Sequence, residues 1–294
     1  MSKNTLFTGS GVAIVTPFRR QEIDFNAFGS IIDYQIENKT DAIIVCGTTG
    51  EASTMPDAEH MDAIRFTVER AAGRVPVIAG TGSNDTRHCV ELSTDAKKVG
   101  ADGLLLVTPY YNKTTQRGLI AHFKAVTDAV DLPIILYNIP GRTGMQIEIA
   151  TLKELSKIDN IVAVKEASGN ISYAAEVAAE CPDLDIYSGN DDMIVPIMSL
   201  GGKGVISVLA NILPKETHEL CDAYLTGNTT KACEMQLHYL KLIKALFMEV
   251  NPIPVKTAMN LMGMNVGNLR LPLSEMEGAN LEKLKSTMSQ YGLL

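Results

Sequence analysis

The most regular feature of the sequence is a series of short apolar runs, each bounded by turn-forming residues. The eight runs are GVAIVTPF from Gly11, DAIIVCGTTGE from Asp41, PVIAGTG from Pro76, ADGLLLVTPYY from Ala101, PIILYNIP from Pro133, IVAVKEAS from Ile161, DIYSGND from Asp185 and GVISVLAN from Gly204. They are apolar at successive positions, which is typical of parallel strands that are covered on both faces. The pattern therefore predicts eight buried strands.

The segments between these runs have the spacing of amphipathic helices. One example is the series Phe28, Ile31, Ile32, Gln35 and Ile36. Strands and helices that alternate eight times over roughly 200 residues predict an α/β fold, a (β/α)8 TIM barrel. An open doubly wound sheet would call for a G-x-G-x-x-G turn after an early strand, and the sequence contains none.

The pattern changes after Asn211. Strand signals stop, and residues 214–226 and 228–250 have helical patterns, followed by shorter helical pieces up to Leu294. We therefore expect a catalytic barrel over residues 1–226 and a small helical C-terminal region over residues 227–294.

The composition of the chain indicates which binding partners and which cellular compartment to expect. The 294 residues carry 26 basic and 34 acidic side chains, a net charge of −8 with no basic cluster, so neither nucleic acid nor an anionic membrane is an expected partner. Five scattered cysteines without a C-x-x-C pair indicate a reducing cytoplasm. The apolar stretch at residues 11–15 is too short for a signal sequence. We expect a cytoplasmic protein.

Histidine and carboxylate positions exclude two kinds of chemistry. In a barrel, catalytic groups gather where strands end and the following loops begin. All five histidines fall in predicted helices instead, and no Asp/Glu cluster has metal-ligand spacing; the histidines are His60, His88, His122, His218 and His238. We therefore expect no metal, and neither a zinc aldolase nor a Ser-His-Asp hydrolase.

Lys165 is the most informative residue at a strand end. Strand alternation places Ile161, Ala163 and Lys165 on one face, and Val162, Val164 and Glu166 on the other. A lysine inside the barrel could form a Schiff base with a carbonyl substrate, which requires its pKa to fall by about three units from about 10.4. Desolvation can supply such a shift. A lysine that leaves the barrel and reaches solvent is the alternative, and this residue alone leaves both open.

Three further features could complete such a site. Tyr137 ends the preceding strand and could move protons, or could be a packed barrel tyrosine. The turn at residues 47–50, with two threonines between glycines, could bind a carboxylate through N–H groups and hydroxyls, or could be a plain turn. Arg142 could bind a second carboxylate, or could be a solvated loop residue.

Five motifs in order extend this interpretation: GTTGE (47–51), TPYY (108–111), YNIPGRTG (137–144), VKEASGN (164–170) and GVISV (204–208). Together they resemble the dihydrodipicolinate synthase and N-acetylneuraminate lyase family of pyruvate-dependent class I aldolases, over essentially the whole chain. The resemblance implies a (β/α)8 barrel with a helical C-terminal extension, assembled as a homotetramer or a dimer. It also implies a lyase of diaminopimelate and lysine biosynthesis that condenses pyruvate with L-aspartate 4-semialdehyde and needs no cofactor, because pyruvate forms a covalent imine.

The same resemblance implies roles for individual residues. Lys165 is similar to the Schiff-base lysine and Tyr137 to the proton shuttle. Thr48 resembles the hydroxyl that links Tyr137 to Tyr111, which in the family comes from the adjacent subunit. Substrate binding then falls to Thr49 for the pyruvate carboxylate, Arg142 for the aldehyde carboxylate, and Ile206 and Gly189 as pocket-lining positions.

Arg142 favours the synthase branch over the lyase branch. A second short anionic substrate makes a guanidinium useful, whereas a sialic-acid lyase must accommodate a long sugar chain and lacks the G-R-T segment after Y-N-x-P. The alternative function is a pyruvate lyase that acts on a sugar acid such as N-acetylneuraminate or 2-keto-3-deoxygluconate. From a different class, a non-catalytic barrel that binds an effector is the third interpretation.

An effector pocket is also implied by the resemblance. Its residues would be Asp57, His60, Asn84, His88 and Tyr110. Lysine-inhibited members have an acidic residue where this chain has His88, so we expect no strong feedback inhibition by lysine.

Overall fold

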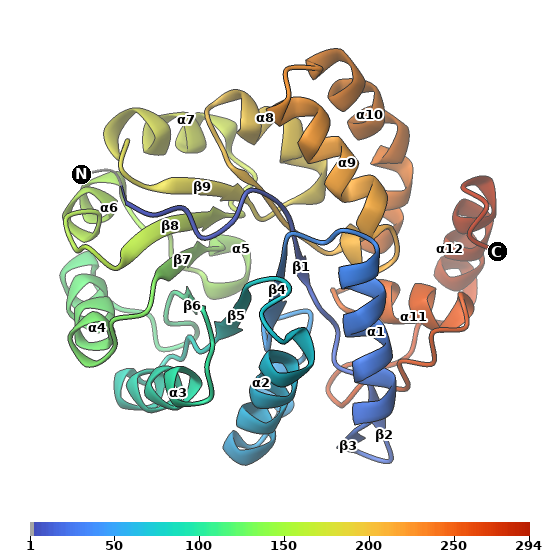
Figure 1. Cartoon of the computed structure of the whole chain (residues 1–294), viewed down its shortest axis with the longest axis horizontal. Coiled ribbons are helices and arrows are strands. Elements are labelled where there is room, and N and C mark those ends of the chain that lie inside the picture. Colours follow the sequence, from blue (N-terminus) through green and yellow to red (C-terminus); the bar gives the residue numbers. More distant parts are fainter. Residues whose placement is uncertain (1–2) are drawn as a thin grey trace.

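Eight parallel strands close into a barrel in the computed structural model, which describes residues 3–294 (Figure 1). The strands are β1 (Gly9–Ala13), β4 (Ala42–Val45), β5 (Val77–Gly80), β6 (Gly103–Val107), β7 (Ile134–Asn138), β8 (Ile161–Glu166), β9 (Asp185–Ser188) and β10 (Gly204–Ser207). The barrel closes because β1 pairs with both β4 and β10. The predicted TIM barrel is confirmed.

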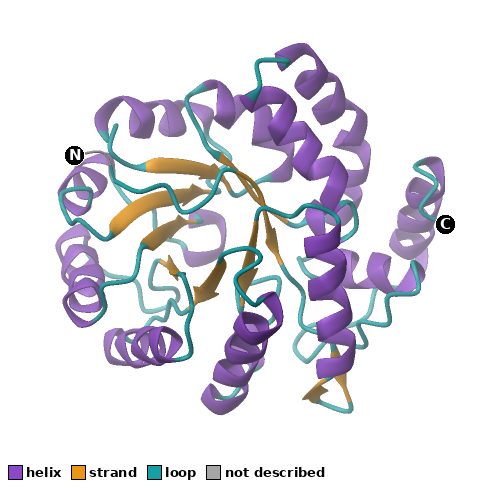
Figure 2. Ribbon diagram, viewed as in Figure 1, coloured by secondary structure: helices purple, strands orange, loops and turns teal. Residues whose placement is uncertain are grey.

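Helices surround the strands on the outside (Figure 2). They are α1 (Phe25–Glu37), α2 (Asp57–Ala71), α3 (Thr86–Lys98), α4 (Gln116–Ala129), α6 (Ile149–Leu155), α7 (Ile171–Glu180), α8 (Ile194–Ser199) and α9 (Pro214–Leu225). Polar side chains cap several N-termini: Asp24 caps α1, Asp85 caps α3 and Asn170 caps α7 by accepting from backbone N–H groups. These caps fix where the strand-to-helix loops end.

Short elements lie within these loops. The helix α5 (Pro140–Thr143) follows β7, and 3-10 turns occupy η1 (Ala52–Thr54), η2 (Asp191–Met193) and η3 (Leu209–Asn211). A hairpin of β2 (Phe18–Arg19) and β3 (Glu22–Ile23), which the sequence analysis did not predict, follows β1. Its strands have two residues each, too few to give a periodic pattern.

Three helices follow the barrel, and they lie on one side of it (Figure 1). They are α10 (Thr229–Leu246), α11 (Ile253–Leu261) and α12 (Gly278–Gln290). The helix expected over 228–250 therefore ends earlier, at Leu246. α10 packs against α9, α11 and α12. Within residues 3–294, no helix has the length and apolar character required to cross a membrane.

Side chains fill the barrel interior away from the catalytic face. Phe7, which precedes β1, stacks on Tyr187 with 4.4 Å between ring centroids, and the Tyr187 hydroxyl donates to the Phe7 carbonyl at 2.6 Å. Gly11 makes room, because a Cβ there would lie 2.8 Å from the Phe7 ring. The carboxyl ends of the strands are thus the end at which chemistry can take place.

A register shift in β8 corrects one expectation. Ile134 pairs with Ile161, whereas Ile135 pairs with Ala163, so one residue of β8 is extra. Val162 consequently packs with the interior side chains and Ile161 with the outer ones. The predicted faces of Ile161 and Val162 were wrong, but beyond the shift Ala163 faces the interior, as expected.

Candidate active site

Lys165 and Tyr137 lie side by side in the barrel. They are register partners on the adjacent strands β8 and β7, and the Lys165 Nζ lies 4.2 Å from the centroid of the Tyr137 ring. Only 6% of Lys165 is exposed. The amine therefore lies in the barrel interior rather than in solvent, which settles the location that the sequence left open.

Burial changes the charge state of this amine. Desolvation lowers the pKa of Lys165 to about 7; the carboxylate of Asp191 opposes the change, and the guanidinium of Arg142 adds to it. The positive form of a lysine is disfavoured wherever water cannot solvate it. A substantial fraction of Lys165 is consequently neutral, and nucleophilic, at physiological pH.

Tyr137 titrates in the opposite direction. Burial raises the pKa of its hydroxyl to about 12, while Arg142 and a hydrogen bond with Thr48 act to lower it. The phenol is therefore protonated at neutral pH and can donate a hydrogen bond or a proton. Thr48 and Arg142 thus both act on the Tyr137 hydroxyl, and Arg142 also acts on the Lys165 amine.

Gly189 lies beside Lys165, and Ile206 lies in the barrel interior. A Cβ at Gly189 would lie 2.6 Å from the Ala167 Cβ and 3.1 Å from the Lys165 Cε, so a larger residue would clash with Ala167 and crowd the lysine side chain. Ile206 is buried among the interior side chains of the barrel. Gly189 thus borders Lys165, and Ile206 lies in the barrel interior.

The turn at residues 47–50 presents unpaired backbone groups. Within it, Gly50 N donates to Gly47 O and Glu51 N to Thr48 O, both at 3.1 Å. Among the described residues, 3–294, the N–H groups of Thr48 and Thr49 have no hydrogen-bond partner. Adjacent free N–H groups are suited to binding an anion, as the sequence analysis anticipated.

Arg142 is held by a residue that the sequence analysis missed. Its side chain extends from α5, and its Nη2 donates to the Asn251 carbonyl at 3.0 Å. The side-chain amide of Asn251 also donates to the Thr49 hydroxyl, at 3.0 Å. Asn251 lies between α10 and α11, which is far along the sequence from any strand. No local pattern of residues therefore marked it as part of the site.

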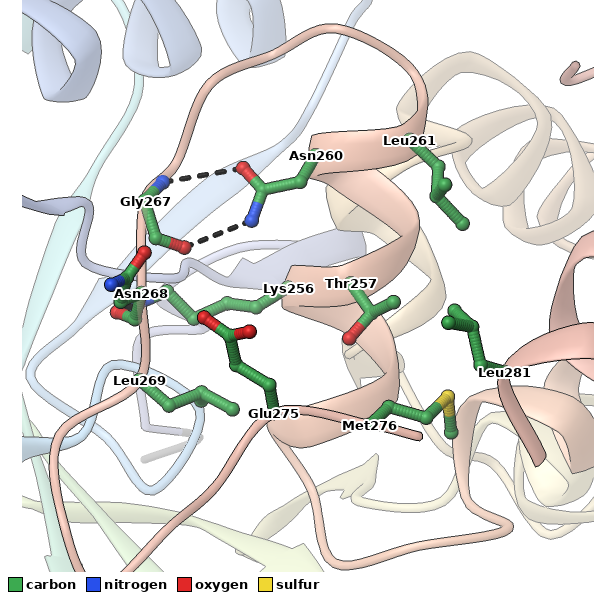
Figure 3. Close-up of a pocket in the computed structure, with 10 residues that line it drawn as sticks. All are labelled: Lys256, Thr257, Asn260, Leu261, Gly267, Asn268, Leu269, Glu275, Met276 and Leu281. Carbon is green, nitrogen blue, oxygen red and sulfur yellow. Dashed lines mark hydrogen bonds between the residues drawn. The ribbon is translucent and has the colours of Figure 1, made fainter. Parts of the chain in front are cut away.

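A buried ion pair between Lys256 and Glu51 anchors the end of the turn at residues 47–50. Glu51 accepts from the Lys256 Nζ at 2.7 Å and from the Arg270 backbone N–H at 2.9 Å. Lys256 projects from α11 and also lines a cavity of about 290 Å³ between α11 and the segment around Met276 (Figure 3). None of the predicted site residues lines that cavity.

Tyr111 does not join the site within one chain. Its side chain is 92% exposed, with a backbone φ of 68°. Tyr137, by contrast, is buried. Within one chain, Tyr111 therefore points into solvent, whereas Tyr137 lies in the barrel interior.

The five residues of the expected effector pocket form local contacts. His88 Nε2 lies 3.0 Å from Asp57 Oδ1, and the Asn84 amide donates to the Tyr110 carbonyl at 3.1 Å. His60 is buried, its Nε2 lies 2.8 Å from the Gly80 carbonyl, and burial lowers its pKa.

Residues 3–294 contain no cluster of three or more His, Cys, Asp or Glu side chains that could hold a metal ion. The five histidines lie in α2, α3, α4, α9 and α10, away from the strand ends.

Comparison with known proteins identifies the relationship. The model of the dihydrodipicolinate synthetase family matches residues 6–291. The chain belongs to the dihydrodipicolinate synthetase family. A relative from Caldicellulosiruptor saccharolyticus, named 4-hydroxy-tetrahydrodipicolinate synthase, is 63% identical over 289 residues, which are 98% of each chain. The family resemblance inferred from the motifs is confirmed.

Solved structures of the dihydrodipicolinate synthetase family have the same fold. A dihydrodipicolinate synthase from Aquifex aeolicus matches with a TM-score of 0.96 and 49% identity over 98% of this chain and 99% of that one. The enzyme from Cyanidioschyzon merolae with lysine bound matches with a TM-score of 0.95 and 41% identity over 99% and 100%.

The lowered pKa of Lys165 predicts a distinct reactivity. Trace labelling with acetic anhydride across a pH series should modify Lys165 with a midpoint near pH 7, because only the neutral amine reacts. The exposed lysines should react at much higher pH, as a free lysine amine with a pKa of about 10.4 does. Peptide mass spectrometry measures both in one digest, and a Lys165 midpoint equal to that of the exposed lysines would contradict the assignment.

Proposed function

We propose that this chain is a 4-hydroxy-tetrahydrodipicolinate synthase, a lyase that condenses pyruvate with L-aspartate 4-semialdehyde in diaminopimelate and lysine biosynthesis. The observation that carries the proposal is the buried amine of Lys165 beside the protonated phenol of Tyr137. The relatives named above support the choice of reaction.

The reaction begins at Lys165. Its neutral amine attacks the keto carbon of pyruvate, and the carbinolamine loses water to give an imine. Loss of a proton from the methyl group gives an enamine, whose carbon attacks the aldehyde carbon and forms the new C–C bond. The amino group of the second substrate then attacks the imine carbon, which closes the ring and releases Lys165, so the overall reaction releases one water.

Tyr137 moves the protons of these steps. Its hydroxyl protonates the departing carbinolamine oxygen and recovers a proton when the amine is released. Thr48, whose side chain acts to lower the pKa of Tyr137, extends the relay towards solvent. We assign the outer end of the relay to Tyr111 of a second copy, since Tyr111 projects away from its own chain.

The two carboxylates bind at separate positions. Thr49, with its free N–H group and its hydroxyl, receives the pyruvate carboxylate, and Arg142 receives the carboxylate of the aldehyde. Gly189 and Ile206 line the pocket. No cofactor enters this mechanism, because the protonated imine itself withdraws electrons from the methyl carbon.

We further propose a homotetramer, with a dimer as the alternative, located in the cytoplasm. Residues 1–226 would act as the catalytic barrel and residues 227–294 as its helical C-terminal region. We keep the expectation that lysine, which is bound in the Cyanidioschyzon merolae relative, inhibits this chain only weakly. The reason is that His88, whose Nε2 lies 3.0 Å from Asp57 Oδ1, stands where lysine-inhibited members have an acidic residue.

Borohydride trapping tests the central assignment. Reduction in the presence of pyruvate should attach a pyruvyl-derived group to Lys165 and abolish activity, and Lys165→Met should give no adduct. Peptide mass spectrometry locates the modification. An adduct on another lysine would refute the mechanism, and pyruvate binding without any adduct would favour the non-catalytic barrel. Faster turnover of N-acetylneuraminate or 2-keto-3-deoxygluconate would favour the lyase.

Arg142→Ala separates the two substrates. Loss of a charged hydrogen bond of about 1.5–3 kcal/mol should lower kcat/KM for the semialdehyde by roughly 10- to 100-fold, while the half-saturating pyruvate concentration in the trapping assay changes little. The control is Arg117→Ala, an exposed arginine of α4. Equal losses for both substrates would show that Arg142 has no selective role.

Complementation tests whether Tyr111 acts from a second copy. Tyr111→Phe should lower kcat by at least about tenfold without altering the oligomer, because only a relay hydroxyl is removed. Mixing Tyr111→Phe with Lys165→Met subunits should restore about a quarter of wild-type activity, because half of the pairs then contain one intact site. If the mixture never exceeds the Tyr111→Phe protein alone, Tyr111 does not act across an interface.

A further inference from the structure

Among residues 3–294, Asn251 alone is hydrogen-bonded to both expected carboxylate binders, Thr49 and Arg142. It is 7% exposed and lies in the connection between α10 and α11. Its Nδ2 donates to the Thr49 hydroxyl at 3.0 Å, and its backbone carbonyl accepts from the Arg142 guanidinium at 3.0 Å. The two halves of the substrate site thus meet at a single residue of the C-terminal region.

We propose that Asn251 is a positioning residue, which orients the Thr49 hydroxyl so that its hydrogen points to the carboxylate of the keto-acid substrate and which holds Arg142 for the second carboxylate. The inference rests on the proposed function, because it takes Thr49 and Arg142 as the groups that bind substrate.

Hydroxyl geometry explains how the orientation works. A threonine hydroxyl has one hydrogen to donate and two lone pairs that accept. Because the Asn251 amide donates to this hydroxyl, the Thr49 hydrogen is not used in that contact. It therefore remains available to an anion beside the free N–H group of Thr49.

The other end of the same amide has no partner. Asn251 Oδ1 is buried and accepts no hydrogen bond from any residue in 3–294. A buried acceptor without a partner costs free energy, and most buried side-chain polar atoms avoid that cost. An apolar side chain could fill the same space without this cost. The amide is therefore explained by the hydrogen bond that its N–H group donates to the Thr49 hydroxyl.

The segment that carries Asn251 is firmly anchored to the same turn. The ion pair between Lys256 of α11 and Glu51 has a length of 2.7 Å, with both side chains essentially inaccessible to solvent. The C-terminal region therefore contacts residues 47–51 at two points, Thr49 and Glu51 (Lys256 in Figure 3). Such a support can hold a hydroxyl to within the tolerance that a binding site needs.

Two substitutions test the proposal through the pyruvate concentration that gives half-maximal borohydride trapping. Asn251→Asp keeps the shape but replaces the donor with an acceptor, which captures the Thr49 hydrogen and repels the carboxylate, so this concentration should rise by at least about tenfold. Asn251→Ala removes the donor without adding charge, and a rise of roughly three- to tenfold is expected. The matched control is Asn260→Asp, an exposed position of α11 whose amide bonds only to Gly267 (Figure 3); it should cause no rise.

A double-substitution cycle shows whether Asn251 acts through the Thr49 hydroxyl or only through the stability of the fold. In Thr49→Val, which lacks the hydroxyl, Asn251→Ala should cause no further rise, because the group through which it acts is gone. Asn251→Ala alone should also raise the half-saturating pyruvate concentration more than the KM of the semialdehyde, since its carbonyl contact with Arg142 remains.

The outcomes distinguish this inference from the proposed function. Additive effects in the cycle, or an unchanged pyruvate concentration in both Asn251 variants, would overturn the positioning role while wild-type trapping at Lys165 leaves the function intact. Absence of a Lys165 adduct in the wild-type protein would refute the function itself. Thermal unfolding of each variant checks the fold, and Asn251→Asp, being isosteric, keeps the test open if Asn251→Ala unfolds.

Discussion

Exclusion of water from the amine of Lys165 is the condition on which the rest of the site depends. A closed barrel of parallel strands surrounds the side chain, and the loss of solvation brings its pKa to about 7. The same burial keeps the Tyr137 phenol protonated. One physical cause thus produces a nucleophile and a proton donor on adjacent strands, with the Lys165 Nζ 4.2 Å from the centroid of the Tyr137 ring, and the absence of a side chain at Gly189 leaves space beside the lysine.

The charge of the site differs from the charge of the molecule. The chain has a net charge of −8, although both proposed substrates carry a carboxylate. The groups that can bind a carboxylate are the Arg142 guanidinium and the free N–H groups at residues 48–49. Of the nearby carboxylates, Glu51 pairs with Lys256, and Asp191 Oδ2 accepts from the backbone N–H groups of Val208 and Leu209. The groups that can bind a substrate carboxylate are therefore local, and the net charge of the molecule does not describe the pocket.

The C-terminal helices are part of this arrangement. Through Asn251 they contact the groups expected to bind both substrates, and through Lys256 they hold the turn that carries Thr49. A region that follows the barrel in the chain thus contributes to the shape of the pocket at the barrel mouth. Its helices pack on one side of the barrel, which places the connection between α10 and α11 beside the loops after β4 and β7 (Figure 1).

The sequence by itself determined the barrel, its order of strands and the strand-end positions of Lys165, Tyr137 and the turn at residues 47–50. These features follow from local regularities, because buried parallel strands and glycine turns leave a pattern within a few residues. Only the tertiary structure decided that Val162 faces inward, that Tyr111 points away from its own chain, and that Asn251 meets Thr49 across 202 residues of sequence. Such contacts depend on how distant segments pack, and no local pattern of residues records that packing.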